Sequence, residues 1–232
     1  IQGPAEEAVT RAGGIVDHVF ELIPAIAIRI PEAALPGLER NPNVVSIEPD
    51  IVVTALQKPD TPPGQAKKPP GGGEEQPPQQ IPWGVDRIDA ECAWSTTTGA
   101  GVKVAVLDTG IDSDHPDLAN NIKGGINYVP KRGRVSPGAW DDDNGHGIHV
   151  AGIIAAENNG IGVVGVAPGA FLYGVKVLDR NGSGWLSDII AGLEWSVNNR
   201  MDIVNMSLGS NTDIQAFHDE CDAVKNAGVV LV

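Results

Sequence analysis

The stretch Val104-Ala105-Val106-Leu107-Asp108-Thr109-Gly110 decides the fold of this chain. A continuous apolar run that ends at a carboxylate and a glycine turn is typical of a strand buried on both faces of a parallel sheet. Strand-like runs and helical patterns alternate after it, at 146–157, 171–178, 186–198, 202–208, 212–226 and 228–232. The alternation predicts an α/β fold with a doubly wound, mostly parallel sheet between residues 81 and 232.

Asp108 stands where such folds carry chemistry, because ligands and substrates bind beyond the carboxyl ends of parallel strands. The Asp-Thr-Gly triplet also occurs in aspartic proteases, in which two carboxylates share one proton. A β/α pattern with a single copy of the triplet argues against that all-β class. A plain capping role of Asp108 in the following turn stays open at this point.

His146 opens an apolar helix between Gly145 and Gly147, which let other backbone or a substrate come close. An imidazole at this position is suited to act as a general base. A metal pair with His149 is the alternative, but no Glu follows His146 as a metalloprotease helix requires. We therefore expect His149 to be buried and hydrogen-bonded. The acidic run 141–143 reads as a solvated loop, with cation binding as the second interpretation.

A Pro-rich stretch at 57–80 lacks any apolar period and is predicted to be a linker. It separates segment 1–56 from segment 81–232. In the first segment the pattern predicts a small α+β unit with a helix, two strands, a second helix and a third strand, at 5–12, 15–20, 25–30, 31–42 and 44–47. A unit this small is expected to need a partner surface.

Composition excludes several classes of function. The 232 residues carry 30 acidic and 16 basic side chains, and the net charge of -14 disfavours nucleic acid as a partner. No apolar run approaches the roughly 20 residues that span a bilayer, so we expect no membrane partner. Two cysteines, Cys92 and Cys221, are too few for a disulfide scaffold and lack zinc-site spacing.

The motifs around Asp108 and His146 resemble those of the subtilisin-like serine proteases, the subtilases. Residues 104–112 with 115–118 are similar to the family's catalytic Asp motif, and 145–152 to its catalytic His motif. Further family blocks follow in the same order at 162–168, 175–178 and 205–209. Segment 1–56 resembles the inhibitory propeptide of the family, most clearly at 23–27 and 45–50. The resemblance implies a subtilisin-like fold preceded by a small α+β propeptide domain.

This resemblance implies a serine endopeptidase that hydrolyses peptide bonds with an Asp-His-Ser triad, of which Asp108 and His146 are present. Ser207 and Ser210 do not match the nucleophile, whose block follows the position of Val232 in the family. We therefore expect a fragment of a longer secreted precursor, clipped at its front as well and inactive by itself. The alternative is a catalytically inactive relative, or an inhibitory and binding module. Ile148 stands where the family has Thr, a difference expected to perturb rather than abolish function.

The resemblance also implies how substrates and ions bind. Protein or peptide substrates would lie between two chain edges at Leu178, Gly182, Ser183, Gly184, Ser207, Leu208 and Gly209, which otherwise read as strand-end turns. One structural Ca²⁺ would bind the side chains of Gln79, Asp117 and Asn159 and the backbone carbonyls of Glu157, Ile161 and Val163. An Asn-Gly turn that closes a helix is the other interpretation of that loop.

The propeptide is expected to serve the monomer as intramolecular inhibitor and folding aid. Its tail, residues 50–56, would lie in the active-site cleft and be cut near Leu56-Gln57.

Overall fold

The computed structural model describes residues 2–56, 77–129 and 138–232. Its centre is a five-stranded sheet in the order β10-β8-β4-β6-β5, in which all neighbouring strands are parallel. The strands are β4 (Lys103–Asp108), β5 (Ile122–Asn127), β6 (Phe171–Lys176), β8 (Ile203–Asn205) and β10 (Val230–Leu231). Asp108 is the last residue of the central strand, so it lies at the carboxyl edge of the sheet.

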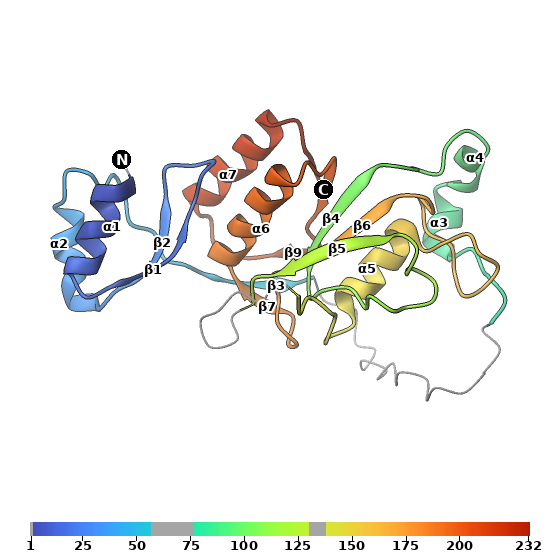
Figure 1. Cartoon of the computed structure of the whole chain (residues 1–232), viewed down its shortest axis with the longest axis horizontal. Helices are drawn as coiled ribbons and strands as arrows, with labels where there is room; N and C mark the ends of the chain where they lie inside the picture. The colour runs from blue at the N-terminus through green and yellow to red at the C-terminus, as the bar shows by residue number, and fades with distance from the viewer. Residues whose placement is uncertain (1, 57–76, 130–137) are drawn as a thin grey trace.

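Helices cover both faces of this sheet, as Figure 1 shows. On one face, α5 (His146–Ala155) packs with Val104 and Val106 of β4. On the other face, α6 (Leu186–Asn198) and α7 (Gln215–Asn226) pack with Ala105 and Leu107 of the same strand. The alternation of side chains along β4 therefore supplies two core layers, and the predicted doubly wound α/β fold is confirmed.

Several elements of this half were not predicted. They include the short helices α3 (Trp83–Arg87) and α4 (Glu91–Trp94), the edge strand β5 and the short strand β7 (Ser183–Trp185). Gly124 and Gly125 interrupt the apolar pattern of β5, which removes the signal of a strand. Within the described ranges, no helix combines the length and the apolarity that crossing a bilayer would require.

The N-terminal segment forms α1 (Gln2–Arg11), an antiparallel pair of strands β1 (Ile15–Val19) and β2 (Ile26–Arg29), the 3-10 helix η1 (Glu32–Ala34) and α2 (Leu35–Glu39). The strand predicted at 44–47 is wrong, because residues 44–51 run as irregular chain. Val45 is fully exposed there, and none of the described strands pairs with it to complete a ladder. The third strand, β3 (Val52–Ala55), begins eight residues later than predicted.

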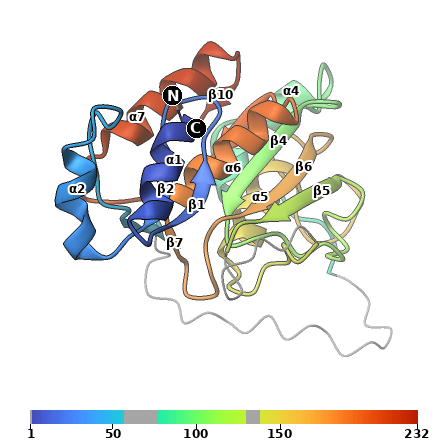
Figure 2. The same ribbon diagram turned by 60° about the vertical axis from the view of Figure 1, so that its left-hand side comes forward.

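This N-terminal unit packs against α6 and α7, on the side away from the five-stranded sheet (Figures 1 and 2). Phe20 and Ile23 belong to the same apolar cluster as the two helices. The backbone amides of Glu21 and Leu22 both donate to one carboxylate oxygen of Glu194 on α6. The expected partner surface of the small unit is therefore the outer side of this helix pair.

Two carboxylates from the same segment bind the N-termini of the helix pair. Glu48 accepts hydrogen bonds from the amides of Gln215 and Ala216, both at 3.0 Å. Asp50 accepts from the amide of Ser187 at 3.0 Å and from its hydroxyl at 2.7 Å. The residues that precede α6 and α7 are Trp185 and Ile214, whose side chains offer no acceptor. Glu48 and Asp50 thus satisfy amides that the helices leave unpaired.

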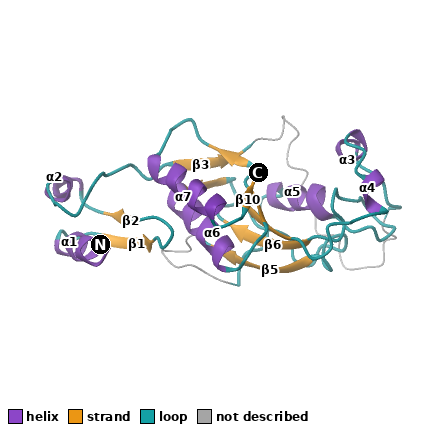
Figure 3. Ribbon diagram, turned by 90° about the horizontal axis from the view of Figure 1, so that it is seen from above, coloured by secondary structure: helices purple, strands orange, loops and turns teal. Residues whose placement is uncertain are grey.

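Strand β3 leaves the N-terminal unit and joins the other half of the molecule. It lies between β7 (Ser183–Trp185) and β9 (Leu208–Gly209) in a three-stranded antiparallel sheet. Figure 3 shows β3 well separated from β1 and β2.

Most of the predicted linker, 57–76, lies outside the described residues. In its last part, Pro78 forms a bridge with Ile161, and Gln80 forms one with Val163. These residues therefore contact the loop after α5, and the linker bounds stay a prediction.

Candidate active site

Asp108 and His146 meet at the carboxyl edge of the sheet. The Nδ1 atom of His146 lies 2.8 Å from Oδ1 and 2.9 Å from Oδ2 of Asp108. The Asp108 side chain is fully buried, whereas the imidazole at the start of α5 keeps a small exposed fraction. A buried carboxylate that holds one ring nitrogen leaves the other nitrogen to face outward for proton transfer.

Burial raises the pKa of the Asp108 carboxyl, because removal from water disfavours its charged form. The hydrogen bonds from His146 and from the Thr109 amide oppose this rise. The amide lies 2.7 Å from Oδ1 of Asp108. The charge of the carboxylate thus depends on donors that also hold it in place beside the ring.

The outward nitrogen of His146 faces the end of β3. Its Nε2 atom lies 3.0 Å from the backbone carbonyl oxygen of Leu56, and the Leu56 amide donates to the carbonyl of Ser207 at 3.0 Å. The imidazole thus lies between two oxygen atoms, one from Asp108 and one from the Leu56 carbonyl. The peptide carbonyl of Leu56 is therefore held at the atom that would move a proton.

The two edges around β3 contain six of the seven residues predicted to bind substrate. On one side Val53 is opposite Gly184, Thr54 is opposite Ser183, and the Ala55 amide donates to the Gly182 carbonyl at 2.8 Å. On the other side the partners of the tail are Ser207, Leu208 and Gly209. A Cβ atom on Gly184 would lie 2.0 Å from a backbone oxygen, so this edge requires glycine.

The seventh residue, Leu178, lies directly beneath this edge. Its side chain is fully buried next to Gly184 while the tail occupies the cleft. Its assignment to substrate binding stays a prediction.

Val53, the fourth residue from the end of the tail at Leu56, is buried beside the cleft. It belongs to the same apolar cluster as Leu186, against which Leu208 and Phe217 pack. Leu56 itself is 61% exposed. Among the described residues, the tail is thus anchored by the side chain of Val53 and by its backbone.

The comparisons with known proteins agree with this geometry. The model of the subtilase family matches residues 99–232, which include both Asp108 and His146. The chain belongs to the subtilase family.

Curated relatives extend the match to the N-terminal segment. The chain is 40% identical to subtilisin E of Bacillus subtilis over 227 residues, which are 97% of this chain and 52% of the relative. It is 43% identical to a thermostable alkaline protease of Halalkalibacterium halodurans, over 94% of this chain and 52% of the relative. It is 44% identical to the M-protease of Shouchella clausii, over 93% of this chain and 49% of the relative. The chain thus spans about half the length of these relatives.

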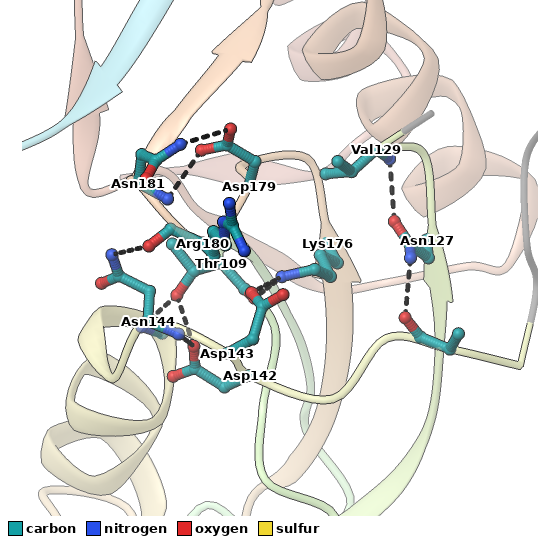
Figure 4. A network of polar contacts seen from close by, with 12 residues as sticks. Thr109, Asn127, Val129, Asp142, Asp143, Asn144, Lys176, Asp179, Arg180 and Asn181 are labelled. Atoms are coloured by element: carbon teal, nitrogen blue, oxygen red, sulfur yellow. Dashed lines mark hydrogen bonds and ion pairs between the residues drawn. The ribbon is translucent and has the colours of Figure 1, made fainter. Parts of the chain in front are cut away.

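The acidic run of this subtilase is exposed at Asp141 and Asp143, as predicted for a solvated loop, yet all three carboxylates bind other parts of the chain. Asp141 binds Ser113 after β4. Asp142 binds Thr109 and the first turn of α5. Asp143 forms an ion pair with Lys176 of β6 (Figure 4). Each carboxylate reaches a different element. An acidic residue just before a helix start is a signal that could have indicated this role.

The prediction that His149 is buried is also wrong, because it lies on the exposed side of α5. The helix buries Gly147, Val150 and Ala151 instead. Ile148 is half-buried and packs against the apolar cluster of this face, while its amide donates to Asp142. At this position Ile148 therefore adds an apolar side chain to the core, where the Thr of the family would have a hydroxyl group.

The residues predicted to bind calcium lie close together. Oδ2 of Asp117 accepts from the Val163 amide at 2.8 Å, and the Gln79 side chain accepts from the Gly160 amide at 2.6 Å. Asn159 accepts from the amide of Ile161 at 3.1 Å.

Asp117 is buried, yet its second oxygen, Oδ1, has no hydrogen-bond partner among the described residues. The predicted calcium ligand of Glu157 is its backbone carbonyl. Its side-chain carboxylate accepts hydrogen bonds from Asn120 instead. No group of three or more His, Cys, Asp or Glu side chains in the described ranges is arranged to hold a metal. Any cation here would therefore depend on amide and backbone oxygens together with Asp117.

Proposed function

We propose that the chain is the N-terminal part of a serine endopeptidase precursor. Asp108 and His146 are two members of its catalytic triad, and the nucleophilic serine comes from outside these 232 residues. The observation that carries the proposal is the backbone of residues 52–56, which lies between two edges as a strand and brings its last carbonyl to His146. A peptide substrate bound in the same way would present its scissile bond at that atom.

The proposed reaction follows from the orientation of the ring. Asp108 accepts a hydrogen bond from Nδ1–H, which leaves Nε2 free to accept a proton. As the serine oxygen attacks the scissile carbonyl carbon, its proton passes to Nε2, and His146 then donates this proton to the leaving amine. Water subsequently attacks the acyl-enzyme carbonyl and loses a proton to Nε2. The bond to the serine oxygen then breaks, that oxygen takes the proton back from His146, and the carboxylic acid product is released.

The substrates in this proposal are extended protein or peptide segments. Strand addition satisfies their backbone amides and carbonyls whatever the side chains are. The apolar surroundings of the buried Val53 add a preference for an apolar residue three positions before the residue whose carbonyl is attacked.

Residues 1–56 act in this proposal as an intramolecular inhibitor and folding aid for the monomer, which is secreted. The support is that β3 fills the cleft while Glu21, Glu48 and Asp50 connect the same segment to α6 and α7. The precursor would be cut between Leu56 and Gln57, since the Leu56 carbonyl lies at His146. Residue 57 lies outside the described residues.

A structural Ca²⁺ belongs to the proposal as well. Its ligands would be Asp117, Gln79 and Asn159 with backbone carbonyls of residues 157, 161 and 163. The unpartnered buried oxygen of Asp117 supports a cation there, because an isolated buried carboxylate oxygen is costly. When bound, the ion would supply charge compensation and cross-linking of segments, and it would take no part in the reaction.

The test is peptide hydrolysis by the whole protein that contains this chain. We expect turnover of a peptide with Val three positions before the cut residue, slower turnover with Asp there, and a loss of at least about a hundredfold in kcat/KM for His146→Ala. Sequencing of the processed protein is expected to begin at Gln57. Absence of turnover in the mature protein would overturn the proposal in favour of an inactive relative, and activity that survives His146→Ala would reject the assigned base.

A further inference from the structure

Asp142 connects the two elements that carry the catalytic pair of the proposed function. Oδ1 of Asp142 accepts from the Thr109 hydroxyl at 2.8 Å, and Oδ2 accepts from the Ile148 amide at 2.8 Å. The amides of Asn144 and Gly145 also donate to Oδ1, each at 2.9 Å. One half-buried carboxylate thus holds the residue after Asp108 and the first turn of the helix that begins at His146.

Thr109 completes the connection from the side of β4. Its amide donates to Asp108, and its hydroxyl oxygen accepts from the Gly147 amide at 2.9 Å. A hydroxyl has a single proton, and a carboxylate can only accept, so Asp142 fixes that proton and leaves the oxygen lone pairs for Gly147. Thr109 is fully buried, which prevents water from replacing these contacts.

The helix needs this external acceptor because the residue before it is Gly145, which has no side chain to cap the first amides. Gly145 also has a φ of 98°, a conformation that favours glycine. At Gly147 a Cβ atom would lie 2.1 Å from the backbone oxygen of Gly110, so the helix packs directly on the turn after Asp108. Small changes at this contact would move the imidazole relative to the carboxylate.

We propose that Asp142 is a positioning residue that sets the geometry of the Asp108–His146 pair through the Thr109 hydroxyl and the first amides of α5. The role of Asp142 in catalysis rests on the proposed function. The contacts that Asp142 makes are present in this chain whatever its function is. The neighbouring Asp141 anchors the same loop to Ser113, and Asp143 anchors it to Lys176 (Figure 4). Neither carboxylate makes a hydrogen bond to α5 among the described residues. They therefore offer matched controls.

The test reads the proton that His146 shares with Asp108, by nitrogen-edited NMR of the complete 232-residue chain labelled at histidine. Asp108→Asn identifies the signal by removing it. We expect Asp142→Asn and Thr109→Val to shift this signal upfield or broaden it through exchange with water. Asp141→Asn and Thr109→Ser, which keep the α5 contacts and the hydroxyl, are expected to leave it in place.

An unchanged signal in Asp142→Asn, or an equal loss in Asp141→Asn, would overturn the proposal. If Asp142→Asn does not fold by circular dichroism, the comparison of Thr109→Val with Thr109→Ser decides in its place. In the whole protein we expect Asp142→Asn to lower kcat about tenfold to a hundredfold with little change in KM. If that protein hydrolyses no peptide, the proposed function fails, while the NMR comparison still judges the positioning role.

Discussion

Glu220 of α7 is a fully buried carboxyl group, and neither of its oxygens has a hydrogen-bond partner in the described part of the chain. Burial, with a smaller contribution from the negative charge of Glu194, raises its pKa from 4.5 to about 8. In the unfolded chain the carboxyl loses its proton near its ordinary pKa. Glu220 therefore stays protonated in the folded protein at neutral pH.

This difference makes stability depend on pH. Between the unfolded value and about 8, the unfolded state has already released the proton that the folded state still binds. The free energy of unfolding should then fall as pH rises through this window, by up to about 1.4 kcal/mol per pH unit. We expect Glu220→Gln to flatten the curve and to be more stable than wild type at pH 8, measured by urea unfolding. The exposed Asp219→Asn on the same helix is the control, and an identical slope in Glu220→Gln would contradict the prediction.

At the scale of elements, the acidic residues before β3 connect the N-terminal unit to two helices. Glu48 accepts hydrogen bonds from the first amides of α7, and Asp50 accepts one from the first turn of α6. We expect Glu48→Gln and Asp50→Asn each to lower the free energy of unfolding by about 0.5–2 kcal/mol, because amides and helix dipoles lose a charged acceptor. Hydrogen exchange at Gln215, Ala216 and Ser187 should accelerate in the matching variant. Glu39→Gln at an exposed site of α2 is the control, and unaltered exchange would count against these contacts.

At the scale of the whole molecule, the proposed calcium site ties together segments that are distant in sequence. Gln79 comes from the segment that begins at residue 77, Asp117 from the loop before β5, and Asn159 from the loop after α5.

A ligand that binds only the folded state and is present at about 100 times its Kd adds about 2.7 kcal/mol to the free energy of unfolding. For a chain of this size, this raises Tm by on the order of 5–10 °C. We expect EDTA to lower the Tm of the chain accordingly and Asp117→Ala to remove that sensitivity. The exposed Asp114→Ala should retain it. A Tm that does not respond to EDTA would reject the site.

Local sequence pattern determined much of the sheet and the catalytic pair. The apolar run that ends at Asp108 and the apolar helix that begins at His146 both have signals within a few residues, namely periodicity and glycine turns. Because parallel strands bring their carboxyl ends to one edge, the position of Asp108 followed from its own strand. The family motifs then paired it with His146.

The resemblance indicated the cleft for the tail at residues 50–56, but only the tertiary structure decided how the rest of the N-terminal segment contacts α6 and α7. The strand predicted at 44–47 is irregular chain, and β3 forms later because β7 and β9 offer it edges. Asp50 and Ser187 meet across 137 positions of sequence, and Thr109 meets Asp142 across 33. Such contacts have no local period, because they depend on how separately folded elements approach each other. For the same reason a run of three aspartates looks like a solvated loop in the sequence, yet binds three different elements in the folded chain.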